Sequence, residues 1–195
     1  MLDRPYPENM SVVPACRPCN ASFSPHEEYL ACLLECIVAG TAEPNGIARP
    51  KVKRILKQKP ALLKRLAATQ SQSASSFEVD VERVRAVVLK LARGHAAYEL
   101  NEPRLDDPTA VSFNALADLS HDNLRAFENP PIADVWPEVG SRALLRLADD
   151  ASLTANRWIV VQDDRYRYLA AQTRGGVVVR LVLRGYLGCE AVWWN

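Results

Sequence analysis

The sequence lacks any run of apolar residues that approaches the roughly 18–20 needed to cross a bilayer as a helix. Its N-terminus also lacks the basic-then-apolar pattern of a secretion signal. These two absences predict a cytoplasmic protein without a membrane partner. The 195 residues are enough for one good core, or for one domain with a small appendage.

The motifs of several enzyme classes are missing as well. There is no glycine-rich phosphate loop, no dinucleotide-binding fingerprint and no ordered Ser, His and Asp set. Nucleophilic enzyme classes therefore have no support in the sequence. The net charge is only +1, which neither requires nor excludes a nucleic-acid partner. The sequence contains no feature that predicts the oligomeric state.

The first clear helix follows a proline-containing arm. Ser24 can cap this helix, Pro25 suits its first position, and Glu27 can complete a capping box. The apolar run that follows stops at Gly40, a residue typical of helix ends. We therefore expect a helix from about Ser24 to Gly40.

The middle of the chain carries further helical patterns. Residues 49–65 should form two short helices divided by Pro60, and the serine-rich residues 70–76 are typical of a linker. Apolar residues at alternating three and four spacing predict a long helix over about 79–100, and a short helix is expected at 141–148.

The last forty residues change to the pattern of strands. Runs rich in β-branched and aromatic residues are separated by turn residues, Asp163-Asp164 and the segment 174–176. This pattern predicts an antiparallel meander. The expected strands are residues 157–162, 165–172 and 177–187, with a fourth at 191–194.

Cys16 and Cys19 have the spacing of a zinc knuckle, in which a tight turn directs two thiolates at one ion. A structural zinc normally has four ligands, so two more are needed. Cys32 and Cys36, one helical turn apart, are one internal candidate for the second pair. The alternative is that these two simply pack in an apolar helix face, as free cysteines readily do.

Residues 49–65 contain eight Lys or Arg and no acid. Such a stretch can follow a phosphate backbone, with each contact releasing counterions, or it can be a solvated helix face. No aromatic residue interrupts the stretch, so base stacking on single strands is not suggested. The candidate nucleic-acid contacts are Lys51, Lys53, Arg54, Lys57, Lys59, Lys64 and Arg65.

Two of the three histidines, His95 and His121, lie downstream of residues 49–65. His95 and Glu99 are four residues apart and could form a metal pair, but His95 also lies on the apolar stripe of its helix. A buried, hydrogen-bonded histidine is the interpretation that we adopt. His121 is expected at a turn or on the surface.

The segment NMSVVPACRPCNASFSPHEEYLACLLECIVAGT, residues 9–41, resembles the second half of the HNH-endonuclease-like, treble-clef (ββα-metal) proteins of bacteria. The segments KLARGHAAYEL and YLGCEAVWW are also similar to later parts of such proteins. The resemblance implies an apolar strand before Cys16, structural zinc on Cys16 and Cys19, and Asn20 in the active site. It further implies cleavage of DNA phosphodiesters assisted by Mg²⁺ or Mn²⁺.

One part of the family pattern is absent from this chain. The family places another Cys-x-x-Cys and a catalytic histidine upstream, whereas no histidine precedes Cys16 here. His26 could contact a metal or a phosphate, although a histidine at a helix start is usually just solvated. We expect either that a complete form carries the missing segment before Met1, or that the chain works as a non-catalytic zinc- or nucleic-acid-binding protein.

The expected fold class is α+β, in three regions. Residues 1–45 would hold a partial treble clef, with its zinc knuckle and helix. Residues 46–155 would be mainly helical, with the basic stretch 49–65 and the linker 70–76. Residues 156–195 would form the antiparallel sheet.

Overall fold

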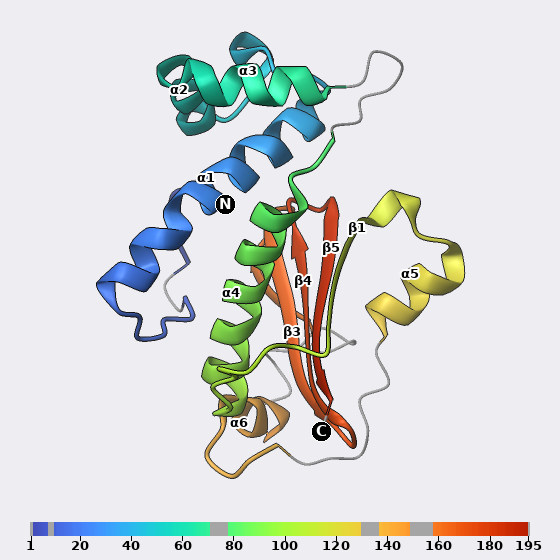
Figure 1. Cartoon of the computed structure of the whole chain (residues 1–195). Coiled ribbons are helices and arrows are strands. Elements are labelled where there is room, and N and C mark those ends of the chain that lie inside the picture. The colour runs from blue at the N-terminus through green and yellow to red at the C-terminus, as the bar shows by residue number, and fades with distance from the viewer. Residues whose placement is uncertain (1, 8–9, 71–77, 130–136, 149–157, 195) are drawn as a thin grey trace. The chain divides into compact units, whose positions relative to one another are not determined.

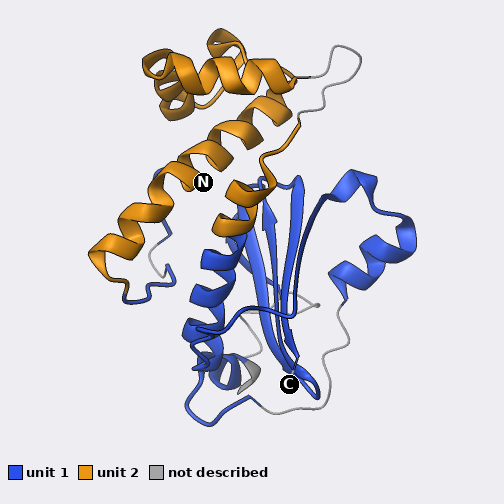
Figure 2. Ribbon diagram, viewed as in Figure 1, with its two compact units in different colours: residues 1–14, 88–195 blue, residues 15–87 orange. Residues whose placement is uncertain are grey.

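The structure is a computed structural model that describes residues 2–7, 10–70, 78–129, 137–148 and 158–194. The chain divides into two compact units, residues 15–87 and residues 1–14 with 88–195 (Figure 2). Helices fill the first unit and a five-stranded antiparallel sheet dominates the second, so the α+β prediction is confirmed. The predicted linker lies outside the described residues except for Gln70.

Helix α1 (Arg17–Ala39) begins seven residues before the predicted start. Cys16 is its N-cap, and Ser24 with Pro25 lie inside the helix instead of opening it. The hydroxyl of Ser24 donates to the carbonyl of Asn20 at 3.4 Å. The expected apolar strand is absent too, because residues 10–15 have neither helical nor strand structure. The predicted start of α1 was wrong because the thiol of Cys16 caps the helix, a role usually taken by side chains with oxygen acceptors.

The end of α1 and the two basic helices agree with prediction. Gly40 adopts a left-handed conformation with φ of 66°, which a residue without Cβ accepts easily. Helices α2 (Pro50–Gln58) and α3 (Pro60–Thr69) are separated at Lys59, directly before Pro60. The buried apolar residues of this unit include Tyr29, Leu30, Leu33, Leu34, Val52, Leu56, Leu66, Val84 and Val87.

Helix α4 (Val81–Leu100) also follows its predicted range closely. The carboxylate of Asp80 accepts a hydrogen bond from the backbone N–H of Arg83, at 3.3 Å, and so caps the first turn. The predicted apolar stripe of this helix begins with Val81, Val84 and Val88. Val84 and Val88 are buried as predicted, but Val81 is 55% exposed.

The sheet is a meander with one added edge strand. Its order is β1-β5-β4-β3-β2, and every neighbouring pair is antiparallel (Figure 1). The predicted strand at 177–187 contains a turn, where Arg184 and Gly185 have φ near 60°. Strand β1 was not predicted. The strands are β1 (Ala110–Ala115), β2 (Ile159–Gln162), β3 (Tyr166–Thr173), β4 (Gly176–Leu183) and β5 (Leu187–Trp194).

The two faces of the sheet have different covers. The part of α4 within this unit lies along one face, where His95 contacts Tyr166 and Tyr168. The opposite face carries a cluster built on Trp158, against which Phe127 of α5 (His121–Glu128) packs. The cluster's buried members are Trp158, Leu169, Ala171, Val178, Val182 and Val192.

Glycine is required where α5 meets the sheet. A Cβ on Gly188 would lie 2.5 Å from Leu116 Cδ2 and 3.2 Å from Phe127 Cζ. The small residue therefore lets Phe127 approach strand β5.

Helix α6 (Arg142–Ala148) starts as predicted, with Ser141 as its cap.

Candidate nucleic-acid interface and thiol pair

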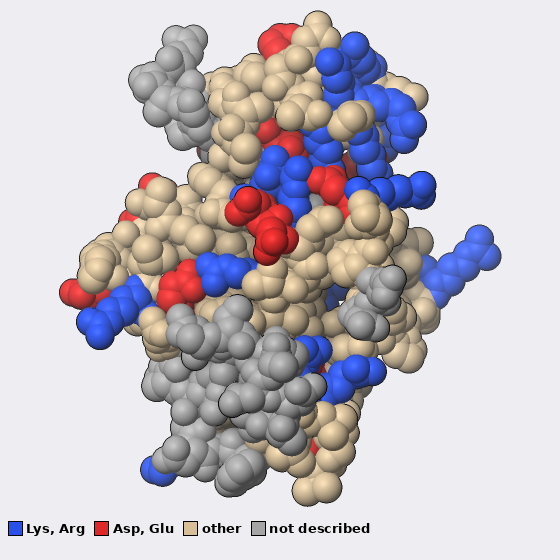
Figure 3. Space-filling view, turned by 180° about the vertical axis from the view of Figure 1, so that it is seen from behind, with Lys and Arg blue, Asp and Glu red and all other residues tan. Residues whose placement is uncertain are grey.

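Helix α2 has one apolar and one cationic side. Val52 and Leu56 are buried, whereas Lys51, Arg54 and Lys57 are exposed. In Figure 3, lysine and arginine side chains gather at the upper right of the view, in the helical unit. The sequence produces this division because apolar residues four apart leave the intervening lysines and arginines on the other sides of the helix.

One of the eight cations in residues 49–65 is not on the surface. Arg49 is buried, and its Nη1 lies 3.9 Å from Oε1 of the equally buried Glu35. A buried arginine needs an acidic neighbour to offset its desolvation. Arg49 is thus part of the interior of the helical unit.

Two further cations are engaged with acids at the surface. Lys59 Nζ lies 2.6 Å from Glu28 Oε1, and the guanidinium of Arg65 pairs with Asp80. Lys59 and Arg65 were predicted to contact nucleic acid, and the structure gives them local partners. The other cations have no ion-pair partner among the described residues, and together we call them the basic face: Lys51, Lys53, Arg54, Lys57 and Lys64.

Cys16 and Cys19 lie together at the start of α1. Cys16 is the N-cap and Cys19 is the third residue of the helix, so the two side chains share the first turn. The backbone N–H of Cys19 donates to Cys16 Sγ at 3.3 Å, and both thiols are exposed.

A hydrogen bond between the two thiols separates their pKa values. The side chain and the backbone N–H of Cys19 both donate to Cys16, which lowers the pKa of Cys16. The same thiol–thiol hydrogen bond, with the charge of Cys16, raises the pKa of Cys19. The thiol of Cys16 is therefore the more acidic of the two.

The alternative site made of four cysteines does not fit the structure. Cys19 and Cys32 belong to one continuous helix and are thirteen residues apart, about 20 Å at the helical rise of 1.5 Å per residue. Burial also raises the pKa of Cys32 to about 12 and that of Cys36 to about 11, which opposes the thiolates that zinc requires. The packing interpretation therefore describes Cys32 and Cys36.

Asn20 and His26 are not brought together. Both lie on α1, six residues apart, so their side chains leave the helix in directions roughly 120° apart. Asn20 is exposed, and His26 is half-buried in the body of the helix instead of at its start. The two side chains therefore do not point toward a common metal or phosphate site.

His95 and Glu99 lie in a buried polar network of the sheet unit and do not face each other as a metal pair. The ring of His95 stacks on Tyr168 with centroids 3.6 Å apart, and His95 Nε2 bonds with the hydroxyl of Tyr166. Burial lowers the pKa of His95 to about 3, so the ring is neutral at pH 7. The expectation of a buried, hydrogen-bonded histidine agrees with this placement.

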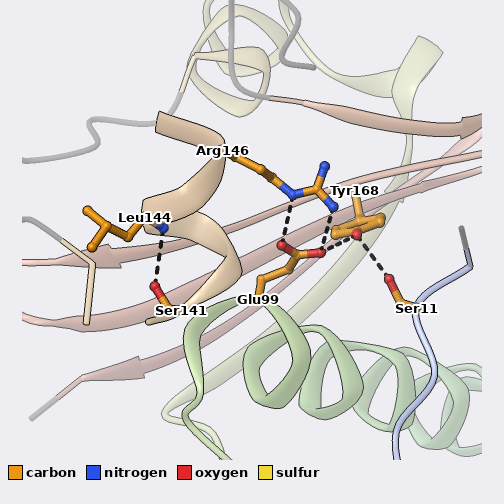
Figure 4. A network of polar contacts seen from close by, with 6 residues as sticks. All are labelled: Ser11, Glu99, Ser141, Leu144, Arg146 and Tyr168. Atoms are coloured by element: carbon orange, nitrogen blue, oxygen red, sulfur yellow. Dashed lines mark hydrogen bonds and ion pairs between the residues drawn. The ribbon is translucent and has the colours of Figure 1, made fainter. Parts of the chain in front are cut away.

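Glu99 is held by Arg146 and Tyr168, and Ser11 extends the network beyond Tyr168 (Figure 4). Arg146 of α6 bonds both carboxylate oxygens, at 3.1 and 3.4 Å, and the Tyr168 hydroxyl donates to Oε1 at 2.6 Å. Ser11 lies 3.1 Å from the same hydroxyl. Sequence reasoning missed Arg146 and both tyrosines, although the alternation of Tyr166 and Tyr168 along one strand already placed them on one face.

Within the described ranges, no three His, Cys, Asp or Glu side chains are grouped as a metal site would require. No helix in the described part of the chain combines the length and hydropathy needed to cross a membrane. His121 is 88% exposed at the first position of α5, in line with its prediction.

No family model, curated protein or solved structure matches this chain.

Proposed function

We propose that this protein binds the phosphate backbone of nucleic acid, most simply duplex DNA, through the basic face of α2 and α3. One observation carries the proposal: five cations on two adjoining helices have no acidic partner among the described residues. Cations that are not neutralised within the protein are the ones that can exchange counterions for phosphates.

The composition of the basic face favours backbone contacts over base recognition. No aromatic residue lies between 49 and 65 on which a base could stack. Lysine, which supplies four of the five cations, acts mainly as a point charge toward phosphate. Binding should therefore be strongly salt-sensitive and nearly independent of base sequence.

Reversing two charges of the basic face should weaken binding. In the variant Lys51→Glu/Arg54→Glu, we expect the affinity for a duplex DNA oligonucleotide to fall about tenfold or more at low salt. The slope of log K against log salt should also become shallower by about 2, since two phosphate contacts are lost. Fluorescence anisotropy with the full chain at several salt concentrations measures both quantities.

The matched control reverses two exposed arginines of the sheet unit, Arg125→Glu/Arg174→Glu. Each double variant changes the net charge by the same amount, from +1 to 1 − 4 = −3. If both variants weaken binding equally, the effect comes from net charge and the basic face is not the site. Single-stranded DNA and duplex RNA serve as competing probes.

We also propose, as a second function, metal-dependent DNA cleavage by a complete assembly that includes this chain. What supports it is the placement of two exposed thiols, Cys16 and Cys19, directly before Asn20 at the start of α1. Structural zinc there needs two ligands from outside the described residues. A divalent ion such as Mg²⁺ or Mn²⁺ would stabilise the charge that develops on the phosphate.

Plasmid nicking distinguishes the two functions. Cleavage predicts that supercoiled plasmid is relaxed when Mg²⁺ or Mn²⁺ is added, and that Asn20→Ala abolishes the relaxation. Binding alone predicts salt-sensitive retention of the plasmid with no nicking under any metal condition. EDTA provides the control for contaminating metal.

A further inference from the structure

The sheet ends in two edge strands, β2 and β1, and they differ in how well they are protected (Figure 1). Strand β2 is four residues long, has an irregular register between Val160 and Gln162, and runs into Asp163-Asp164. Asp3, near the N-terminus, exchanges two hydrogen bonds with the side chain of Gln162, at 2.8 and 3.2 Å. Short length, irregular register, nearby charge and a covering segment are the usual devices that prevent a sheet edge from pairing.

Strand β1 is a better edge for pairing. It is six residues long, and its register with β5 is regular from end to end. No charged residue lies between Pro108 and Ala117, so the strand carries no charge that would repel a second strand. A regular, uncharged edge of this kind favours the addition of another strand.

The backbone groups on the outer side of β1 follow from the ladder with β5. The N–H of Leu116 donates to the carbonyl of Tyr186 at 2.8 Å, which makes these two residues a hydrogen-bonded pair. Such pairs alternate along an antiparallel ladder, so the N–H and C=O groups of Val111, Phe113 and Ala115 point away from β5. Within the described ranges, these groups have no backbone partner.

Two polar side chains of β1 are also left unused. Ser112 and Asn114 are exposed and line a groove together with Asn123 of α5. Neither side chain bonds another residue in the part of the chain that the structure describes. Phe113, between them, lies on the opposite face of the sheet and is half-buried. The strand thus offers backbone groups, two amide or hydroxyl groups and one aromatic ring.

We propose that two copies of this chain associate through β1, paired antiparallel about a two-fold axis at Phe113. In this register, Val111 of one copy lies opposite Ala115 of the other. The outward N–H groups of all three residues then reach carbonyls of the second copy. The two Phe113 rings become neighbours on one face, and Ser112 lies opposite Asn114 of the second copy on the other.

The register favours a second copy as the occupant of this edge, because each position meets a compatible one. An aromatic ring meets an aromatic ring, a hydroxyl meets an amide, and no charge faces another charge. Moving the axis by one residue in either direction would place Val111 or Ala115 opposite a residue outside β1. The association uses none of the residues of the basic face, so it holds or fails independently of nucleic-acid binding.

Sedimentation equilibrium of the full chain measures the association directly. The average mass should rise with concentration from 21.7 kDa toward twice that value. In Ser112→Lys/Asn114→Lys, lysines of the two copies lie opposite each other, so the dissociation constant should rise about tenfold or more. The matched control Asn129→Lys/Val139→Lys adds the same charge at exposed positions outside β1 and should leave the dissociation constant nearly unchanged.

Introduced cysteines test the register. In Ser112→Cys/Asn114→Cys, the new thiols of the two copies face one another across pairs whose Cα atoms are about 4.5 Å apart, within the range of a disulfide. Mild oxidation should give a covalent dimer, and peptide mass spectrometry should find the bond between positions 112 and 114. Ser112→Cys alone should cross-link through this position about tenfold more slowly or less, because its equivalent in the second copy is two residues away.

Three results would overturn the proposal. The first is a parent chain that stays monomeric at every concentration, which would leave the edge to an extended segment of another protein. The second is a dimer that the two lysine variants weaken equally, or not at all. The third is cross-linking of Ser112→Cys as fast as that of the double cysteine variant. Circular dichroism checks that each variant keeps its secondary structure, and the measurement on the parent chain needs no variant.

Discussion

Replacing Arg146 with methionine is expected to lower the free energy of unfolding by about 3–5 kcal/mol. Glu99 is 1% exposed, and Arg146 is the only cation that bonds its carboxylate among the described residues. Without the guanidinium, the buried carboxylate of Glu99 would keep, among the described residues, only the hydroxyl of Tyr168 as a partner. Chemical denaturation at pH 7 gives the change directly.

Two further variants test whether the loss of stability comes from the buried charge of Glu99. The double variant Glu99→Met/Arg146→Met should recover much of the lost stability, because the pair is then replaced by apolar side chains of similar length. Arg165→Met, which breaks a more exposed pair with Asp3, should cost about 1 kcal/mol or less. If the double variant is no more stable than Arg146→Met, packing around α6 and not the charge on Glu99 explains the loss.

The helices that were predictable from sequence are those whose ends carry strong local signals. Gly40 ends α1, Pro60 divides α2 from α3, and the periodicity of α4 marks its length. These signals act over a few residues and do not depend on tertiary contacts. The start of α1 was predicted wrongly because Ser24 and Pro25 form the stronger start pattern in the sequence. In the structure the helix begins earlier, at Arg17, with Cys16 as its N-cap.

The sheet was predictable except where strands depend on distant partners. Strand β1, residues Ala110–Ala115, has a modest strand pattern of its own and is fixed by pairing with β5, about eighty residues later. The turn between β4 and β5 was hidden within an apolar run, since Arg184 takes a left-handed conformation without being glycine or asparagine. Local sequence cannot reveal such pairings.

The candidate interface was only partly readable from sequence. The charge of residues 49–65 is evident from the sequence. The sequence does not show that Arg49 and Lys59 pair with acids of α1, or that Arg65 pairs with Asp80, the residue before α4. Only the fold separates cations that are engaged internally from those left for a ligand. The same limit hid the partners of Glu99, which are Arg146 and Tyr168, and the contact of Ser11 with Tyr168.

The second large effect is a loss of stability at acidic pH, caused by the buried His95. Between pH 6 and pH 4, His95 should remove about 2–3 kcal/mol from the free energy of unfolding. Its pKa is about 3 in the folded protein because of burial, against about 6.5 in the unfolded chain. The unfolded state therefore binds the extra proton first, and stability falls as the pH drops from about 6.5 toward 3.

His95→Gln isolates this contribution from that of the carboxylates. The side chains that contact the His95 ring are Tyr166 and Tyr168, and Glu99 bonds the hydroxyl of Tyr168; none of these groups is removed by the substitution. At pH 7 the variant is expected to be less stable than the parent, because the hydrogen bond to Tyr166 is altered. Between pH 6 and pH 4, however, it should lose less stability than the parent. His121→Gln, at an exposed position, should leave the pH dependence unchanged. Equal pH slopes for the parent and His95→Gln would mean that His95 can take up a proton inside the fold, and hence that water or an acid reaches the ring without unfolding.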